Sequence, residues 1–273
     1  MIGNLLMVGG DRRALALEKL LEEDGYSVDT LGLHEGDEAT ARPSAAQAVL
    51  WAYPFSARDG CVPTMTGMTL HPEDLLKQLP DHIPLLLGRG IKSVEGYLCK
   101  SYEENQALVQ RNAEISAEAA VSEVMQRTER ALMDMTVLVI GYGRFGRALA
   151  QRLKALGTEV WVAARREEQR LIAASDGMKP VDIHEMHDVL SSIHMVLNTV
   201  PAQVMGEREL RAMQPECRIL ELASAPYGFD RETTKKMGIQ YEILPALPAR
   251  YAPLSAARAL EKTVVHLLEE MQK

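Results

Sequence analysis

The sequence has little cysteine, no long apolar run and no excess of positive charge, and each absence excludes a class of protein. Cys61, Cys99 and Cys217 are scattered and form neither a disulfide framework nor a zinc pattern, which predicts a reducing, cytoplasmic setting and no metal site. The net charge of −8 argues against non-specific binding to nucleic acid or to an acidic membrane surface. No apolar run approaches the ~20 residues that span a bilayer, and the opening MIGNLLMVGGD lacks the basic segment of a signal peptide.

Strand-like and helix-like segments alternate along the chain, which favours an α/β fold of two parallel-sheet domains, Rossmann-like or flavodoxin-like. In the first half we predict strands over 4–10, 27–33, 46–54 and 83–90, helices over 12–25 and 72–79, and a short strand over 107–112, whose apolar pattern would also suit a helix. In the second half we predict strands over 135–141, 159–164, 195–200, 218–224 and 239–244, and helices over 146–156, 167–175, 183–191, 206–213 and 231–238.

A helix over 115–133 is expected to link two domains, with Ser116 as its N-cap and Glu118 in its first turn. This places an N-terminal, substrate-side α/β domain at 1–114 and a Rossmann domain at 115–253. The chain ends in a predicted helix within 254–273, which we expect to return to the first domain and pack on it.

A glycine-rich turn lies between a predicted strand and a predicted helix, in the sequence VLVIGYGRFGRALA. Gly141, Gly143 and Gly146 form G-x-G-x-x-G: the first permits a tight turn, the second lets the backbone approach a pyrophosphate, and the third lets helix and strand pack closely. The amides at the start of the helix then face the anion. Because strand, turn, helix and second strand follow in order, the pattern predicts a dinucleotide cofactor.

The next strand, EVWVAA, runs into Ala164, Arg165 and Arg166 where many such folds carry an acid about 20 residues beyond the turn. Without that acid a bare ribose loses its hydrogen-bond acceptor, and Arg165 offers a charge-assisted contact to a 2′-phosphate. The sequence therefore predicts NADP(H) rather than NAD(H). The alternative is that the arginines only begin a solvated helix and pair with Glu167 or Glu168.

Several segments together resemble the family of the dipicolinate synthase A subunit over essentially the whole chain. The matching positions are Gly9, Gly10, Asp11 and Arg13; Asn112, Ser116 and Glu118; Gly141, Gly143, Gly146, Ala164 and Arg165; Asn198, Thr199, Val200 and Pro201; Leu222, Ala223, Ser224, Pro226, Gly228 and Asp230; and the loop at 247–257. The chain departs from the family at Ala119, Ala246, Ala249 and Ala257, where glycine is usual, and at Ile115 and Ser255, where proline and threonine are usual.

The resemblance implies oxidation of dihydrodipicolinate to pyridine-2,6-dicarboxylate by NADP⁺ during sporulation, together with a flavoprotein-like B subunit. We expect a homo-oligomer, because folds of this kind often dimerise. The expected cofactor site comprises Gly141, Tyr142, Gly143, Arg144, Phe145, Gly146, Ala164, Arg165, Arg166, Asn198, Thr199, Val200, Pro201, Ala223 and Ser224.

Binding of a dicarboxylate requires cations or N–H groups, and the candidate cations are Arg13, Arg89, Lys92 and Arg250. Ser116 and Ser255 complete the expected substrate site. No residue stands out as the proton acceptor: Glu118 is one candidate, a plain helix-start carboxylate is an equal interpretation, and water is another acceptor.

Two other functions compete with this one. A 2-hydroxy-acid dehydrogenase would generally use an Arg with a Glu–His pair, and no convincing pair is present. A non-catalytic subunit that binds or senses NADP(H) is consistent with the Gly-to-Ala departures, which could weaken activity.

Overall fold

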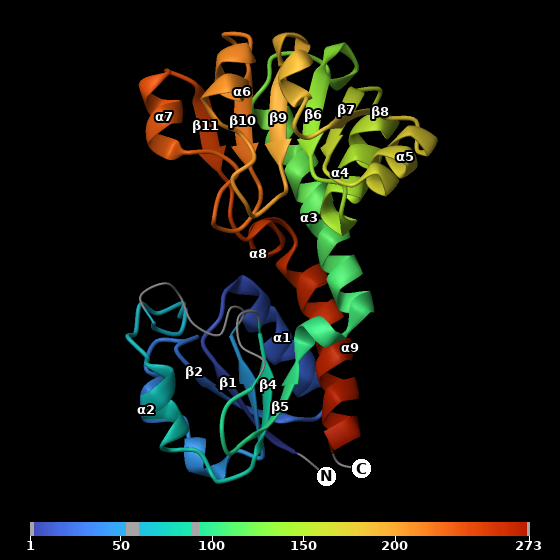
Figure 1. Ribbon diagram of the computed structural model, residues 1–273. Coiled ribbons are helices and arrows are strands. Elements are labelled where there is room, and N and C mark those ends of the chain that lie inside the picture. The colour runs from blue at the N-terminus through green and yellow to red at the C-terminus, as the bar shows by residue number, and fades with distance from the viewer. Residues whose placement is uncertain (1–2, 53–59, 89–92, 272–273) are drawn as a thin grey trace. The chain divides into compact units, whose positions relative to one another are not determined.

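The computed structural model describes residues 3–52, 60–88 and 93–271. The chain divides into two compact units, one formed by residues 1–112 and 248–273 and the other by residues 113–247 (Figure 1). Among the described residues, no helix is both long enough and apolar enough to traverse a bilayer.

The first unit is built on a five-stranded parallel sheet. Its strands are β1 (Asn4–Val8), β2 (Ser27–Leu31), β3 (Ala48–Trp51), β4 (Pro84–Leu87) and β5 (Leu98–Ser101), in the spatial order β2-β1-β3-β4-β5. This is the strand order of flavodoxin-like folds, in which the chain reverses direction of winding between β1 and β3.

Both faces of this sheet are buried, because neighbouring residues of a strand point to opposite sides. Leu6 and Val8 contribute to a cluster that includes Leu75 of α2 (Pro72–Leu76). Leu5 and Met7 contribute to a cluster on the other face, formed with α1 (Arg12–Glu23) and α9 (Pro253–Met271). The last helix of the chain therefore packs beside the first one, as Figure 1 shows.

The second unit is built on a six-stranded parallel sheet. Its strands are β6 (Thr136–Ile140), β7 (Glu159–Ala164), β8 (Lys179–Asp182), β9 (Met195–Asn198), β10 (Arg218–Glu221) and β11 (Gln240–Ile243), in the order β11-β10-β9-β6-β7-β8. Relative to the first strand of the unit this is the 3-2-1-4-5-6 order of Rossmann folds, with its switch point between β6 and β9. The predicted fold class of two parallel-sheet α/β domains is confirmed.

Helices cover the second sheet on both sides. One face packs against α3 (Gln106–Gln126) and α4 (Arg144–Ala155), through residues such as Val124 and Leu149. The other face packs against Met186, Leu190 and α6 (Glu207–Ala212). The remaining α-helices are α5 (Glu167–Ser175), α7 (Arg231–Lys236) and α8 (Leu247–Tyr251), and short 3₁₀ turns lie at Asp37–Ala39, Pro43–Ala45, Tyr102–Glu104, Leu132–Asp134, Met186–Asp188 and Leu190–Ser192.

The long helix begins earlier and ends earlier than the sequence predicts. The segment 107–112, predicted as a strand, is the start of α3, and the predicted linker helix at 115–133 ends at Gln126. The cap is Asn105, whose Oδ1 accepts hydrogen bonds from the amides of Ala107 (3.0 Å) and Leu108 (3.1 Å). Ser116 is therefore a buried residue inside the helix and not its N-cap.

Three other predictions differ from the structure. The segment 183–191 forms two 3₁₀ turns rather than a helix, although the buried Met186 and Leu190 are spaced as on a helix. The edge strands β5 and β8 were not predicted, because neither has an apolar run and β8 contains Pro180, which suits only an edge. The last helix begins at Pro253, so Ser255 lies inside its first turn.

One departure from the family pattern falls on a strained backbone position. Ala246 has a φ of +53°, in the left-handed region that disfavours a side chain by about 1–2 kcal/mol. We expect Ala246→Gly to raise the free energy of unfolding by about 0.5 kcal/mol or more, because relief of strain exceeds the added freedom of glycine in the unfolded chain.

Urea denaturation of Ala246→Gly and Ala174→Gly would check this expectation. Ala174 is also exposed but is helical in α5, so glycine there should lower stability by about 0.5–1 kcal/mol. An equal decrease in the free energy of unfolding in the two variants would contradict the strain at Ala246.

Candidate functional site

The glycine-rich turn lies at the switch point of the second sheet, between β6 and α4. Gly141 has a φ of +93°, and a Cβ there would lie 2.7 Å from both Thr199 Oγ1 and Val200 Cγ2. A Cβ on Gly146 would lie 2.2 Å from the Gly141 carbonyl oxygen. The first and third glycines therefore allow the backbone of β6, the start of α4 and the segment after β9 to come together.

Gly143 has a different environment from the other two glycines. Nothing lies within 4 Å of the position that its Cβ would occupy. It is the N-cap of α4, with extended backbone and no side chain capping the helix. The amides of the first turn thus face open space, as a pyrophosphate requires, so the residues present fit a dinucleotide.

A cavity of about 750 Å³ opens at this turn. It brings together most of the predicted cofactor-site residues, namely Gly141, Tyr142, Gly143, Arg144, Phe145, Gly146, Ala164, Arg165, Arg166, Thr199, Val200 and Pro201. Sequence reasoning missed its other lining residues, Gln169, Ile183, His184, Ala202, Gln203 and Val204. Ile183 and His184 follow β8 directly, so identifying that edge strand would have indicated them.

Arg165 and Arg166 are exposed at the cavity, and neither has an ion-pair partner within the described part of the chain. Glu167 and Glu168 therefore do not neutralise them here. The nearby Arg170 instead binds the backbone: its Nη1 donates hydrogen bonds to the carbonyl oxygens of Ala164 and Arg165, each at 2.9 Å.

The carboxylate at the end of β8 is already paired. Asp182 lies beside Ala164 in the strand register, and its Oδ2 is 2.7 Å from Arg170 Nη1. Ala164 is buried, and its side chain offers no hydrogen-bond acceptor. The end of β7 therefore presents exposed positive charge with a compensated acid next to it, which suits a phosphate better than a bare ribose diol.

Tyr142 within the turn is held by a partly buried hydrogen bond. Its hydroxyl donates to Asp176 Oδ2 at 2.7 Å, and Arg147 Nε donates to the same oxygen at 2.8 Å. Arg147 and then Tyr142 lower the pKa of Asp176, while burial and the neighbouring carboxylate raise the pKa of Tyr142. The phenol thus stays protonated and anchors the turn to the segment after α5.

The ends of β9 and β10 are occupied by two buried polar side chains. Asn198 and Glu221 are fully buried, lie side by side in the register, and hydrogen-bond at 2.7 Å from Asn198 Nδ2 to Glu221 Oε1. The side chain of Asn198 is therefore bound to Glu221, and Asn198 is not among the residues that line the cavity. Ala223 and Ser224 are also not among the residues that line the cavity. Glu221 was missed; the signal was an acid inside the apolar stretch RILELA.

The candidate substrate residues are divided between the two units. Arg13, Arg250 and Ser255 belong to the first unit, and Ser116 and Glu118 belong to the second. Arg250 and Ser255 are exposed on α8 and α9, and Glu118 is exposed on α3. Arg89 and Lys92 lie outside the described residues.

Arg13 is engaged by an acid of its own motif. Its Nη2 and Nε lie 2.7 and 2.9 Å from the carboxylate oxygens of Asp11, which also accepts the Arg13 amide as the N-cap of α1. The cavity beside this pair measures about 40 Å³, which is smaller than a pyridine ring requires. As it stands, this pocket alone does not accommodate an aromatic dicarboxylate.

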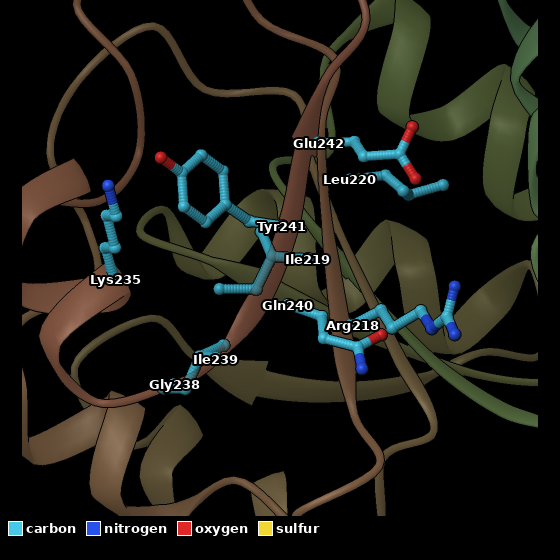
Figure 2. A pocket seen from close by; sticks show the side chains of 9 residues that line it. All are labelled: Arg218, Ile219, Leu220, Lys235, Gly238, Ile239, Gln240, Tyr241 and Glu242. Carbon is cyan, nitrogen blue, oxygen red and sulfur yellow. The ribbon is translucent and has the colours of Figure 1, made fainter.

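A third cavity, of about 400 Å³, lies at the edge of the second sheet around β11. Figure 2 shows Lys235 and Tyr241 on one side of the strand and Glu242 on the other. None of its lining residues belongs to the glycine-rich turn. Within the described residues, no cluster of three or more His, Cys, Asp or Glu side chains is arranged to hold a metal ion.

Comparison with known proteins relates each half of the chain to a family. A family model for the N-terminal domain of the dipicolinate synthase A subunit matches residues 4–105. A model for the NAD-binding domain of D-isomer specific 2-hydroxyacid dehydrogenases matches residues 101–227. The second match agrees with the cavity and shows an NAD(P)-dependent oxidoreductase fold that binds a nicotinamide cofactor.

Similar proteins cover nearly the whole chain. The dipicolinate synthase A subunit of Bacillus subtilis (strain 168) is 25% identical over 288 residues, which cover 98% of this chain and 96% of that protein. The crystal structure of the dipicolinate synthase A subunit from Bacillus halodurans matches with a TM-score of 0.86 and 25% identity, covering 97% of each chain. A D-lactate dehydrogenase from Sporolactobacillus sp shares the fold, with a TM-score of 0.65, 15% identity, and coverage of 99% of this chain and 96% of that one.

The likeness therefore includes both the N-terminal domain that characterises one family and the cofactor-binding domain shared with many dehydrogenases. The predicted resemblance to the family of the dipicolinate synthase A subunit is confirmed by these matches.

Proposed function

We propose that this chain is an NADP-dependent oxidoreductase that oxidises dihydrodipicolinate to dipicolinate (pyridine-2,6-dicarboxylate). The observation that carries the proposal is the presence, in one chain, of the dipicolinate synthase N-terminal domain and a nicotinamide-binding domain. The proteins from Bacillus subtilis and Bacillus halodurans that it resembles over nearly their full lengths are both named as the dipicolinate synthase A subunit.

The preference for NADP(H) is supported by the charges at the end of β7. Arg165 and Arg166 are exposed at the cavity, while Asp182 is compensated by Arg170. A 2′-phosphate thus meets a bidentate cation and no uncompensated acid, whereas a bare 2′-hydroxyl finds no carboxylate to accept its hydrogen bond.

In the proposed reaction, a nicotinamide cofactor would supply the hydride acceptor, and the dihydropyridine ring would lose a hydride and a proton and become aromatic. The chain holds the reactants: Gly143 and the first turn of α4 bind the pyrophosphate, and Thr199, Val200 and Pro201 line the cavity at the switch point. The substrate carboxylates are assigned to Arg13, Arg250, Ser116 and Ser255. Glu118, as an exposed carboxylate, and water are the two candidate proton acceptors.

The family resemblance extends the proposal to the setting of the reaction. The substrate is a small dicarboxylate, and the partner is a flavoprotein-like B subunit in the cytoplasm of a sporulating cell. The chain itself is proposed to form a homo-oligomer, without nucleic-acid or membrane partners.

Substitution of Arg165 tests the cofactor. We expect Arg165→Ala to weaken the binding of NADPH about 10- to 100-fold, because a charge-assisted hydrogen bond contributes ~1.5–3 kcal/mol. The affinity for NADH should be unchanged. Fluorescence titration of both nucleotides against each variant measures this. Arg211→Ala, at an exposed arginine of α6 outside the cavity, is the matched control. A wild-type protein that binds NADH as tightly as NADPH would contradict the proposed specificity.

Substitution of Gly143 tests where the pyrophosphate binds. Gly143→Ala should fold normally, since the backbone is extended and the added Cβ meets no atom within 4 Å. It should nevertheless lower the affinity for NADPH at least ~10-fold, because the methyl group occupies the space in front of α4 where the pyrophosphate binds. Gly206→Ala is the control, because Gly206 is also an extended N-cap glycine but caps α6, outside the cavity. Equal NADPH affinity in the two variants would place the phosphates elsewhere.

Turnover tests the reaction itself. Purified protein supplied with dihydrodipicolinate and NADP⁺, with and without a candidate B subunit, is expected to form dipicolinate, followed by its absorbance and by NADPH fluorescence. No turnover in either condition, with NADPH still bound, would instead favour a non-catalytic subunit that binds or senses NADP(H).

A further inference from the structure

Glu221 is a buried carboxylate that the proposed reaction does not use. It ends β10 with no exposed surface and accepts hydrogen bonds from Asn198 Nδ2 (2.7 Å), the Gly228 amide (2.8 Å) and the Ala223 amide (3.0 Å). Burial raises its pKa, and these three donors oppose the rise. Among the described residues, no cation pairs with it. A buried charge without a cation beside it is costly, so it depends on these hydrogen bonds.

The first contact leads from Glu221 to the cofactor cavity through Asn198. The amide of Asn198 donates from Nδ2 to the Val200 carbonyl at 2.9 Å and accepts from the Val200 amide at 3.1 Å. Both backbone groups of Val200 are thereby fixed by one side chain. Val200 lines the cavity and also packs against Gly141 of the turn.

The second contact leads to the same loop through Gly228. Its amide donates to Glu221, and its carbonyl accepts from the amides of Val204 (2.9 Å) and Met205 (2.8 Å). Gly228 also lies directly against Asn198, since a Cβ there would be 2.4 Å from Asn198 Nδ2. The two ends of the segment 200–204, which lines the cavity, are therefore both tied to Glu221.

These contacts suit a carboxylate and no other side chain of similar shape. All three partners of Glu221 are donors, and both carboxylate oxygens accept. A glutamine would direct an NH₂ group at one of these donors and leave at least one buried hydrogen bond unmade.

We propose that Glu221 is a positioning residue, which holds the 200–204 loop in the conformation that binds the nicotinamide cofactor without touching the cofactor itself. The inference deepens the proposed function and rests on it for the identity of the nucleotide. Because the contacts of Glu221 all lie within the protein, their effect on the order of the loop is testable in the free protein.

The variants Glu221→Gln, Glu221→Asp and Asn198→Ala test the proposal in the full-length protein. We expect Glu221→Gln to lower the affinity for NADPH at least ~10-fold, since it loses a hydrogen bond to a charged group. Glu221→Asp keeps the charge and should retain part of the affinity that Glu221→Gln loses. Asn198→Ala, which removes only the hydrogen bonds made through Asn198, should also lower the affinity for NADPH. Hydrogen exchange of the free protein should rise at 199–205 and 222–228 in all three, and least in Glu221→Asp.

The matched control is Glu123→Gln, which removes the charge of a buried glutamate of the same unit that pairs with Arg127 and lies outside the cavity. It should lower stability while leaving NADPH affinity within twofold of wild type. Wild-type affinity in Glu221→Gln, an equal loss in Glu123→Gln, or unchanged exchange at 199–205 would overturn the proposal. A wild-type protein that binds neither NADPH nor NADH would defeat the proposed function instead, and the exchange result would then decide on Glu221 alone.

Discussion

The close approach of α4 to β6 is the contact on which the cofactor site depends. With no side chain on Gly146, its Cα packs against the Gly141 carbonyl, at a distance where a methyl group would stand 2.2 Å from that oxygen. This packing sets the first turn of α4 at the end of the sheet, with Gly143 open in front of it. The anion-binding amides, the exposed Arg165 and the loop after β9 are all arranged around that turn.

Elements with strong periodicity were predictable from the sequence, and elements on the sheet edges were not. Apart from Thr136 and Glu159 at their starts, the strands β6 and β7 are apolar because helices cover both faces, and the glycine spacing places the turn between β6 and α4. β8 carries Lys179 and Pro180, so its pairing is decided by tertiary context rather than by an apolar run. Because β8 was not predicted, His184, which comes shortly after β8 and lines the cavity, was not predicted either.

The residues that line the cofactor cavity were also more predictable than the buried residues that hold them in place. Spacing alone indicated Gly141, Gly143 and Arg165, because each acts through its own backbone or charge. Asn198 has a partner 23 residues away in Glu221, and only strand register brings the two together. A sequence shows that an acid interrupts RILELA, but not that its three hydrogen-bond donors converge there. A side chain that acts through others is thus seen only in the folded structure.

The first unit shows the opposite problem, in which a predicted charge is not available. Asp11 and Arg13 belong to one motif, and the fold joins them in a bidentate ion pair at the start of α1. A dicarboxylate that approached Arg13 would meet a neutral pair, and Asp11 also uses its carboxylate to cap the helix. A substrate carboxylate would therefore compete with Asp11 for the Nε and Nη2 groups of Arg13. Asp11 thus limits how Arg13 can bind a dicarboxylate.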